Sequence, residues 1–238
     1  MKNYTHVFFD LDHTLWDYEK NVKESLTEIF EIYTLDSLGI LTLDLFYQAF
    51  IEVNYGLWGL YNLGKIDKIN LRKERFKRIF EHLGADGATV PLEMEGDFMS
   101  RTSSKKHLFP HSLETLTYLK EKYHLHIITN GFNESQSLKM TSSGINTYFN
   151  LVVTSETIGH KKPDKRIFEY AMAQLGTIAD NCLMIGDNLE SDILGAQGVR
   201  MDQVFFNPGN KVCETLPDGS KVCPTYTIKC LSELKSLL

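Results

Sequence analysis

Two aspartates stand two residues apart at the end of a short apolar run near the start of the chain. The run covers residues 5–11, and the motif reads Asp10-Leu11-Asp12-His13-Thr14. Such a run favours a buried strand, so both carboxylates are expected where the chain leaves that strand. The pair could bind a hard cation such as Mg²⁺. It could also divide labour, with one acid as nucleophile and the other as proton donor and acceptor. A helix cap or a solvated turn would use the same residues.

A hydroxyl, an amide and a glycine follow a second apolar run, as Thr129-Asn130-Gly131. Gly131 would let backbone N–H groups approach a ligand closely. The three residues suit an oxyanion held at a turn from strand to helix. Ordinary turn chemistry is the alternative interpretation.

A basic segment, Gly159-His160-Lys161-Lys162-Pro163-Asp164, follows a third apolar run. One fixed lysine beside the rigid proline could neutralise developing negative charge. The alternative is a solvated loop before a helix that Asp164 caps.

Two further acids, Asp187 and Asp192, follow the apolar run that begins at Cys182. Joined to Asp10 and Asp12, they would form a cluster whose mutual repulsion requires a cation, which indicates a bound divalent metal. Acids favoured by the dipole at the start of a helix are the alternative.

Alternating strands and helices must position these residues. We expect strands at 5–11, 124–129, 151–154, 182–185 and 203–206, and helices at 113–122, 134–143, 165–175 and 189–198. This alternation predicts a parallel sheet covered on both faces, which is an α/β fold with a Rossmann-like core. Because such sheets bind ligands beyond the carboxyl ends of their strands, the four polar segments are expected at one edge of the sheet.

A helical block separates the first strand from the others. Apolar residues recur at helical spacing in four stretches between residues 17 and 105, and no convincing strand interrupts them. We therefore predict a core domain of residues 1–15 and 106–238, and an inserted helical-bundle cap of residues 16–105. The aromatic stretch at 55–64 could offer rings for a nucleobase to stack on or could pack inside the bundle.

Composition narrows the class of protein. The 238 residues are 42% hydrophobic and 24% charged, as in globular proteins, and 25 basic against 31 acidic residues leave a net charge of −6. This balance argues against a nucleic-acid polymer as partner. No run reaches the roughly 20 apolar residues of a membrane span, and the N-terminal apolar run is too short for a signal peptide. We therefore expect a cytoplasmic protein without a membrane partner.

The four cysteines include no Cys-x-x-Cys pair, so a zinc knuckle is not expected and free thiols are the default. Cys213 and Cys223 flank the turn signal Pro217-Asp218-Gly219. A hairpin there could bring the two sulfurs together, or could be an ordinary surface hairpin.

The four motifs together resemble those of the haloacid dehalogenase-like hydrolases. The resemblance covers nearly the whole chain: DxDx[TV] is found at Asp10–Thr14, the Ser/Thr motif at Thr129, the lysine motif at Lys162 and the GDxxxxD motif at 186–192. The helical insertion is similar to the α-helical cap of that family. His13 departs from the pattern, since glycine is frequent there, and we expect it to alter the loop and leave the chemistry unchanged.

The resemblance implies a Mg²⁺-dependent phosphomonoesterase acting on a small phosphate ester. Asp10 would attack phosphorus and form an aspartyl-phosphate. Asp12 would protonate the leaving oxygen and then activate water, which requires a pKa above its ordinary value. Phosphoryl oxygens would be held by Thr129, Asn130, Gly131 and Lys162. The metal would lie between Asp10, the backbone carbonyl of Asp12 and Asp187, with Asp192 in support.

The presence of Asp12 favours phosphoryl transfer over dehalogenation, because the family's dehalogenases attack carbon and need no acid there. The opening residues and the cap further resemble the bacterial 5′-nucleotidases that act on pyrimidine nucleoside monophosphates. Phosphatases of a sugar phosphate or phosphoglycolate and a phosphosugar mutase are alternatives. A catalytically inactive binding module would be expected to lack a motif, and all four are present.

Overall fold

The computed structural model describes residues 3–210 and 222–238 and divides into two compact units. One unit comprises Met1–Tyr18 and Lys106–Leu238 and is called the sheet unit here. The other comprises Glu19–Lys105 and is called the helical unit. The predicted role of the helical unit as a cap stays a prediction.

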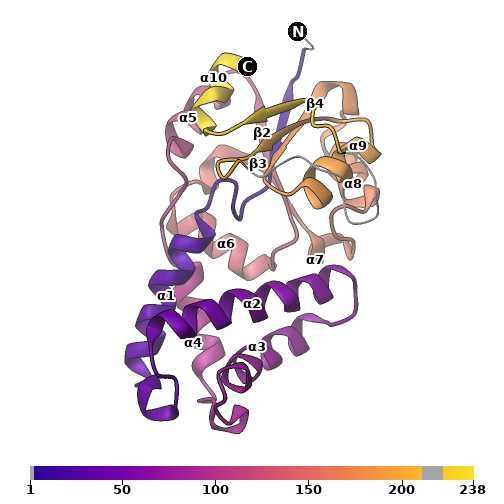
Figure 1. Ribbon diagram of the computed structural model, residues 1–238. Helices are drawn as coiled ribbons and strands as arrows, with labels where there is room; N and C mark the ends of the chain where they lie inside the picture. Colours follow the sequence, from indigo (N-terminus) through magenta and orange to yellow (C-terminus); the bar gives the residue numbers. More distant parts are fainter. Residues whose placement is uncertain (1–2, 211–221) are drawn as a thin grey trace. The chain divides into compact units, whose positions relative to one another are not determined.

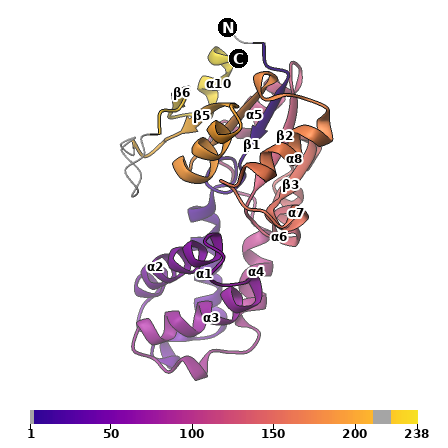
Figure 2. The ribbon, with the colours of Figure 1, turned by 90° about the vertical axis from the view of Figure 1, so that its right-hand side faces the viewer.

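Six parallel strands form the sheet, in the order β3-β2-β1-β4-β5-β6. Figure 2 shows β6 at one edge and β3 towards the other. The strands are β1 (His6–Phe9), β2 (His124–Thr129), β3 (Phe149–Thr154), β4 (Cys182–Gly186), β5 (Asp202–Phe206) and β6 (Tyr226–Ile228). The predicted α/β class is confirmed. The sequence analysis missed β6, whose three residues are too few to show an alternating pattern.

Helices cover both faces of the sheet (Figure 1). Val7 and Phe9 pack in one apolar cluster with residues of α5 and α10, whereas Phe8 packs in another with residues of α8 and α9. Successive strand residues point to opposite faces, and burial of both faces explains why the strands read as nearly continuous apolar runs. The helices of this unit are α5 (Ser112–Lys120), α6 (Asn133–Ser142), α7 (Ser155–Ile158), α8 (Lys165–Leu175), α9 (Gly195–Gly198) and α10 (Leu234–Leu237).

The helix predicted at 189–198 is divided in two. A π-helical turn, η5 (Leu189–Leu194), precedes α9. The Asn188 carbonyl accepts hydrogen bonds from the N–H groups of both Asp192 and Ile193, at 3.0 and 3.2 Å, which widens the turn. The Asn188 side chain caps it by accepting from Glu190 and Ser191. A regular 3.6-residue period does not encode such a turn, which is frequent at functional sites. Short 3₁₀ turns complete the unit: η3 (Asn146–Tyr148), η4 (Ala179–Asn181) and η6 (Leu231–Glu233).

The helical unit contains no strand among its described residues. Its elements are α1 (Tyr18–Ile32, which starts at the end of the sheet unit), η1 (Leu35–Leu38), α2 (Leu43–Asn62), α3 (Lys68–His82), η2 (Gly87–Thr89) and α4 (Met94–Ser103). Side chains of Thr42 and Asp67 cap α2 and α3. Buried phenylalanine rings from three helices pack together at its centre: Phe46, Phe50, Phe76 and Phe98.

The aromatic stretch of α2 has both buried and exposed members. Tyr61 is 6% exposed and packs edge-on against Trp58, whereas Tyr55 is 45% exposed. Packing in the bundle therefore accounts for part of the stretch. None of the described helices is both long and apolar enough to cross a membrane. Cys213 lies outside the described residues, and so does the hairpin predicted between it and Cys223.

Three histidines meet at the amino ends of β1 and β2. His6 Nδ1 and His126 Nε2 lie 3.0 Å apart, and the His124 ring lies 5.3 Å from that of His6. His126 is fully buried. Burial, with His6 and His124 beside it, lowers the pKa of His126 to about 3.

Acidification is therefore expected to destabilise the fold through His126. Below about pH 6.5, the ordinary pKa of histidine, His126 binds a proton in the unfolded chain but stays neutral in the folded chain. The free energy of unfolding therefore falls by about 2 kcal/mol between pH 7.5 and pH 5. Urea denaturation at pH 7.5 and at pH 5 would measure this fall, which should be smaller in a His126→Phe variant than in wild type. The exposed His111→Asn variant should behave as wild type. Equal losses in His126→Phe and wild type would contradict the assignment.

Candidate active site

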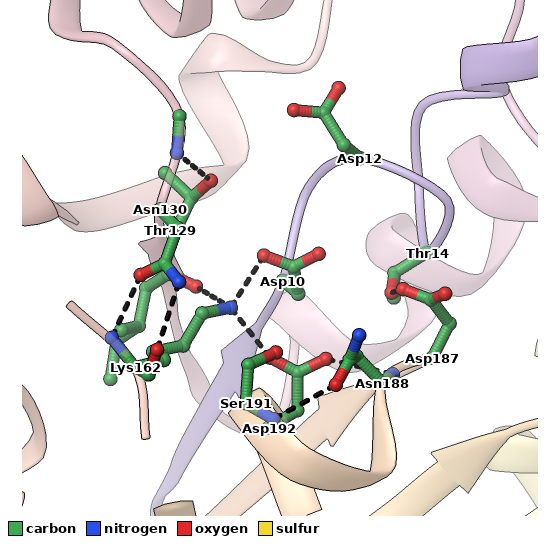
Figure 3. A network of polar contacts seen from close by, with 12 residues as sticks. Asp10, Asp12, Thr14, Thr129, Asn130, Lys162, Asp187, Asn188, Ser191 and Asp192 are labelled. Atoms are coloured by element: carbon green, nitrogen blue, oxygen red, sulfur yellow. Dashed lines mark hydrogen bonds and ion pairs between the residues drawn. The ribbon is translucent and has the colours of Figure 1, made fainter. Parts of the chain in front are cut away.

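The site lies at the carboxyl ends of the central strands. Strand β1 is paired with β2 on one side and with β4 on the other. From β2 the sheet continues outward to β3, and from β4 it continues in the opposite direction to β5, so the strand order reverses at β1. Ligands of open parallel sheets bind at such a reversal of strand order. Asp10 follows β1, Thr129 ends β2 and Asp187 follows β4. Figure 3 shows that these residues come together, joined by Lys162 from the segment after β3.

Lys162 is the central cation of the site. Its Nζ donates to Asp10 Oδ1 at 2.6 Å, to Asp192 Oδ1 at 2.6 Å and to the Ile128 carbonyl at 2.8 Å, and the residue is 2% exposed. Burial disfavours its charge, but the two carboxylates outweigh burial and raise the pKa of Lys162 above its ordinary value. Lys162 is therefore a fixed cation, and the alternative of a solvated basic loop does not apply to it. Asp164 does cap α8, as expected.

Asn130 holds Lys162 in place. Its Nδ2 donates to the Lys162 carbonyl at 3.0 Å, and its Oδ1 accepts from the Lys162 N–H at 2.8 Å. The side-chain amide thus spans the segments after β2 and β3. Because the Asn130 side-chain amide is bound to the Lys162 backbone, the predicted phosphate contact of Asn130 would have to come from its own backbone.

Three carboxylates form an acidic cluster. Ligand oxygens of Asp10, Asp187 and Asp192 all lie within 4.8 Å of one another. Burial raises the pKa of Asp10 well above its ordinary value; Lys162 opposes this shift, and the neighbouring charges of Asp192 and Asp187 add to it. A donor set made only of carboxylate oxygens, with more negative charge than Lys162 balances, fits Mg²⁺. The Asp12 carboxylate is not part of this cluster.

The members of the cluster differ in how firmly the protein holds them. Asp192 is fully buried; it accepts from Lys162 on Oδ1 and from the Asn188 N–H on Oδ2 at 3.0 Å. A Cβ on Gly186 would lie 2.3 Å from that Oδ2, so glycine is required there. Asp187 is half-buried and accepts from the Thr14 hydroxyl at 3.3 Å. This arrangement suits Asp10 and Asp187 as direct metal ligands, with Asp192 holding Lys162 and the loop.

Thr129 is oriented as a donor. Its Oγ1 accepts from the Gly131 N–H at 3.1 Å and from Gln136 Nε2 at 2.7 Å. Because both contacts use lone pairs, the hydroxyl hydrogen remains to be donated. Gly131 has a packing role besides its turn, because a Cβ there would lie 2.0 Å from Gln136 Nε2.

Asp12 is held by two residues of α6. Lys139 Nζ donates to Oδ1 at 2.6 Å and Gln136 Nε2 donates to Oδ2 at 2.9 Å. Burial raises the pKa of Asp12, but Lys139, Gln136 and His13 together outweigh it, and the net shift is downward. The expectation of a raised pKa is therefore wrong for this structure. The physical reason is the buried ammonium group of Lys139, which stabilises the ionised carboxylate.

The sequence analysis assigned no role to five polar residues that touch the site: Thr14, Gln136, Lys139, Asn188 and Ser191. Gln136 and Lys139 are three residues apart in the helix that follows Thr129, so they share one helix face. That spacing was the available signal. The backbone of His13 has a φ of 62°, in the left-handed region that favours glycine, which explains why the family motif often has glycine there.

Replacing Lys162 with methionine is expected to destabilise the fold. The change leaves the carboxylates of Asp10 and Asp192 buried together without their shared cation, which costs about 3–5 kcal/mol in comparable buried pairs. Urea denaturation with EDTA present would measure the loss. The exposed Lys165→Met variant serves as control and should lose under about 0.5 kcal/mol. A Lys162→Met protein as stable as wild type would contradict the role of Lys162 as charge partner.

Comparison with known proteins finds similarity along nearly the whole chain. A model of the haloacid dehalogenase-like hydrolases matches residues 4–200. Pyrimidine 5′-nucleotidase YjjG of Escherichia coli K12 is 31% identical over 98% of this chain and 96% of its own. Glyceraldehyde 3-phosphate phosphatase of Methanothermobacter thermautotrophicus is 30% identical over 98% of each chain. The HAD-hydrolase YfnB of Bacillus subtilis, solved with bound magnesium, superposes with a TM-score of 0.85 at 29% identity and covers 100% of this chain and 99% of its own.

Proposed function

Because the chain belongs to the haloacid dehalogenase-like hydrolase family, we propose that it is a phosphomonoesterase whose substrates are pyrimidine nucleoside 5′-monophosphates. One observation carries the proposal: Asp10 lies beside a buried lysine and two further carboxylates, and a second ionisable acid, Asp12, stands two residues away. A nucleophile, a fixed cation, a cation-binding cluster and a proton carrier are the groups that phosphoryl transfer through a covalent intermediate requires.

In the first step, a carboxylate oxygen of Asp10 forms a bond to phosphorus. The bond from phosphorus to the ester oxygen breaks, and that oxygen takes a proton from the protonated form of Asp12. Lys139, Gln136 and His13 outweigh burial and lower the pKa of Asp12, so this form is the minor one and the first step draws on it. The products are an aspartyl-phosphate and the free alcohol. Lys162 and the Thr129 hydroxyl stabilise negative charge on the phosphoryl oxygens.

In the second step, Asp12 takes a proton from water as the water oxygen attacks phosphorus. The acyl-phosphate bond breaks, inorganic phosphate leaves and the Asp10 carboxylate is restored. The proton that Asp12 gains here is the one it gives to the next leaving group, so the two steps close a cycle. Mg²⁺ held by Asp10 and Asp187, with Asp192 in support, would supply charge neutralisation at the phosphoryl group.

The choice of nucleotide rests on similarity to the E. coli nucleotidase. A comparable likeness to a sugar-phosphate phosphatase makes substrate class the point to test. Phosphate release should be measured with Mg²⁺ over pyrimidine and purine monophosphates, glyceraldehyde 3-phosphate, phosphoglycolate and p-nitrophenyl phosphate. We expect kcat/KM for the pyrimidine nucleotides to exceed the others by at least about tenfold.

Three outcomes separate the possibilities. A preference for a sugar phosphate would replace the substrate class and leave the phosphomonoesterase in place. An isomerised sugar phosphate without release of inorganic phosphate would indicate a mutase. Failure to hydrolyse every ester would overturn the proposed function.

A further inference from the structure

We propose that Lys139 and Gln136 are positioning residues that set the direction of the Asp12 carboxylate for proton transfer to the leaving group. The inference rests on the proposed function, because it concerns the residue that carries the proton in that reaction. Neither residue belongs to the motifs from which the site was predicted.

The contacts of Asp12 support this role. Each of its oxygens has its own donor: Lys139 Nζ at 2.6 Å for Oδ1 and Gln136 Nε2 at 2.9 Å for Oδ2. Both donors come from one face of α6. A carboxylate held through both oxygens cannot rotate about its terminal bond without losing a contact, so its direction is determined by α6 and not by its own loop. In Figure 3 this carboxylate points away from Asp10 and from the Lys162 network.

The two donors are themselves fixed. Gln136 is fully buried, and its Nε2 donates to both Asp12 and Thr129, so it connects the segment after β1 with the end of β2. Lys139 is 7% exposed, and its Nζ lies 4.5 Å from the ring centroid of Trp16. Trp16 is fully buried in the loop that carries Asp12. Cation–π contact with this ring adds a second attraction that keeps the ammonium group in place.

Lys139 differs from Lys162 in what it touches. Lys162 contacts Asp10 and Asp192, whereas the ion pair of Lys139 is with Asp12. Lys139 should therefore influence the reaction through Asp12 and not by binding the phosphoryl group. Loss of Lys139 should therefore slow the reaction only for substrates whose leaving group needs a proton.

The test compares two aryl esters with wild type and with Lys139→Met. Phenyl phosphate releases a basic phenolate that needs protonation, whereas 2,4-dinitrophenyl phosphate releases a stable anion. For both esters kcat/KM covers the steps up to loss of the leaving group. Lys139→Met should lower kcat/KM for phenyl phosphate about 100-fold, the size of a misplaced general acid. For the dinitrophenyl ester it should lower kcat/KM by less than about threefold, because no proton is needed there.

A double-mutant cycle with Asp12→Asn completes the test. If Lys139 acts through Asp12, adding Lys139→Met to Asp12→Asn should change kcat/KM for phenyl phosphate by less than about twofold. Gln136→Leu should also lower kcat/KM more for phenyl phosphate than for the dinitrophenyl ester, on top of a loss shared by both esters, because Gln136 also holds the Thr129 hydroxyl. The matched control is Lys165→Met, which replaces an exposed lysine on α8 and should leave kcat/KM for both esters as in wild type. Thermal unfolding of each variant verifies that it is folded, and Gln136→Leu carries the test if Lys139→Met is not.

Equal losses on both esters, or losses that multiply in the double variant, would overturn the inference, because Lys139 would then act on the phosphoryl group or on the fold. Rates for Lys139→Met and Gln136→Leu equal to wild type on phenyl phosphate would also overturn it. A wild-type protein inactive on both esters would instead remove the proposed function. The two failures are thus distinguishable.

Discussion

Replacing Asp10 with asparagine should reduce hydrolysis of every phosphate ester by at least about 10³-fold, as expected when a covalent nucleophile is removed. An amide has the same shape as the carboxylate but cannot form the aspartyl-phosphate. The Asp10 carboxylate also accepts from Lys162 at 2.6 Å, so the change removes one of the charges that hold this cation. Release of inorganic phosphate from p-nitrophenyl phosphate, with Mg²⁺ present, would measure the loss.

The exposed Asp180→Asn variant has the same change of charge outside the site and should retain full activity. A substrate radiolabelled in its phosphate group should leave label on acid-quenched wild-type protein, as the aspartyl-phosphate, and none on Asp10→Asn. Retention of more than about a hundredth of the wild-type rate would exclude Asp10 as nucleophile.

Removal of divalent metal with EDTA should stop turnover, and added Mg²⁺ should restore it. We expect a fall of at least about 100-fold, because charge on the phosphoryl group and on three clustered carboxylates would lose its counter-ion. Phosphate release before and after addition of Mg²⁺ measures the effect. Undiminished turnover in EDTA would contradict the assignment of the acidic cluster as a metal site.

A binding measurement separates metal affinity from activity. A cation that binds only the folded chain raises its unfolding temperature, so Mg²⁺ should stabilise wild type and the Asp180→Asn control. Asp187→Asn removes a half-buried candidate ligand and should shrink this shift. An unchanged shift in Asp187→Asn would remove that residue from the ligand set.

The positions of the main site residues were predictable from local pattern. Apolar runs identify strands because burial on both faces demands them, and parallel strands place their carboxyl ends at one edge. Polar residues at the ends of three such runs therefore had to lie near one another, whereas Lys162 follows β3 only after α7. The structure brings Asp10, Thr129, Lys162 and Asp187 to that edge. The same reasoning predicted the α/β class, since β1 to β5 each lie within a few residues of a predicted range.

The direction of each side chain beyond its strand required the tertiary structure. A period of two or 3.6 residues specifies a face only while the chain stays in a strand or helix. Asn130 lies in a turn, and its amide binds the backbone of Lys162, 32 residues away. The π-helical turn that positions Asp192 depends in the same way on hydrogen bonds that hydrophobic spacing does not encode.

The sequence by itself determined which acids and bases this protein has and at which edge of the sheet they gather. Only the tertiary structure decided their electrostatic state. Lys139 lies 127 residues from Asp12 along the chain, yet their ion pair reverses the expected direction of the pKa shift of Asp12. The sign of such a shift depends on a balance between burial and charge at a few ångströms, and that separation is set by the packing of α6 against the loop after β1.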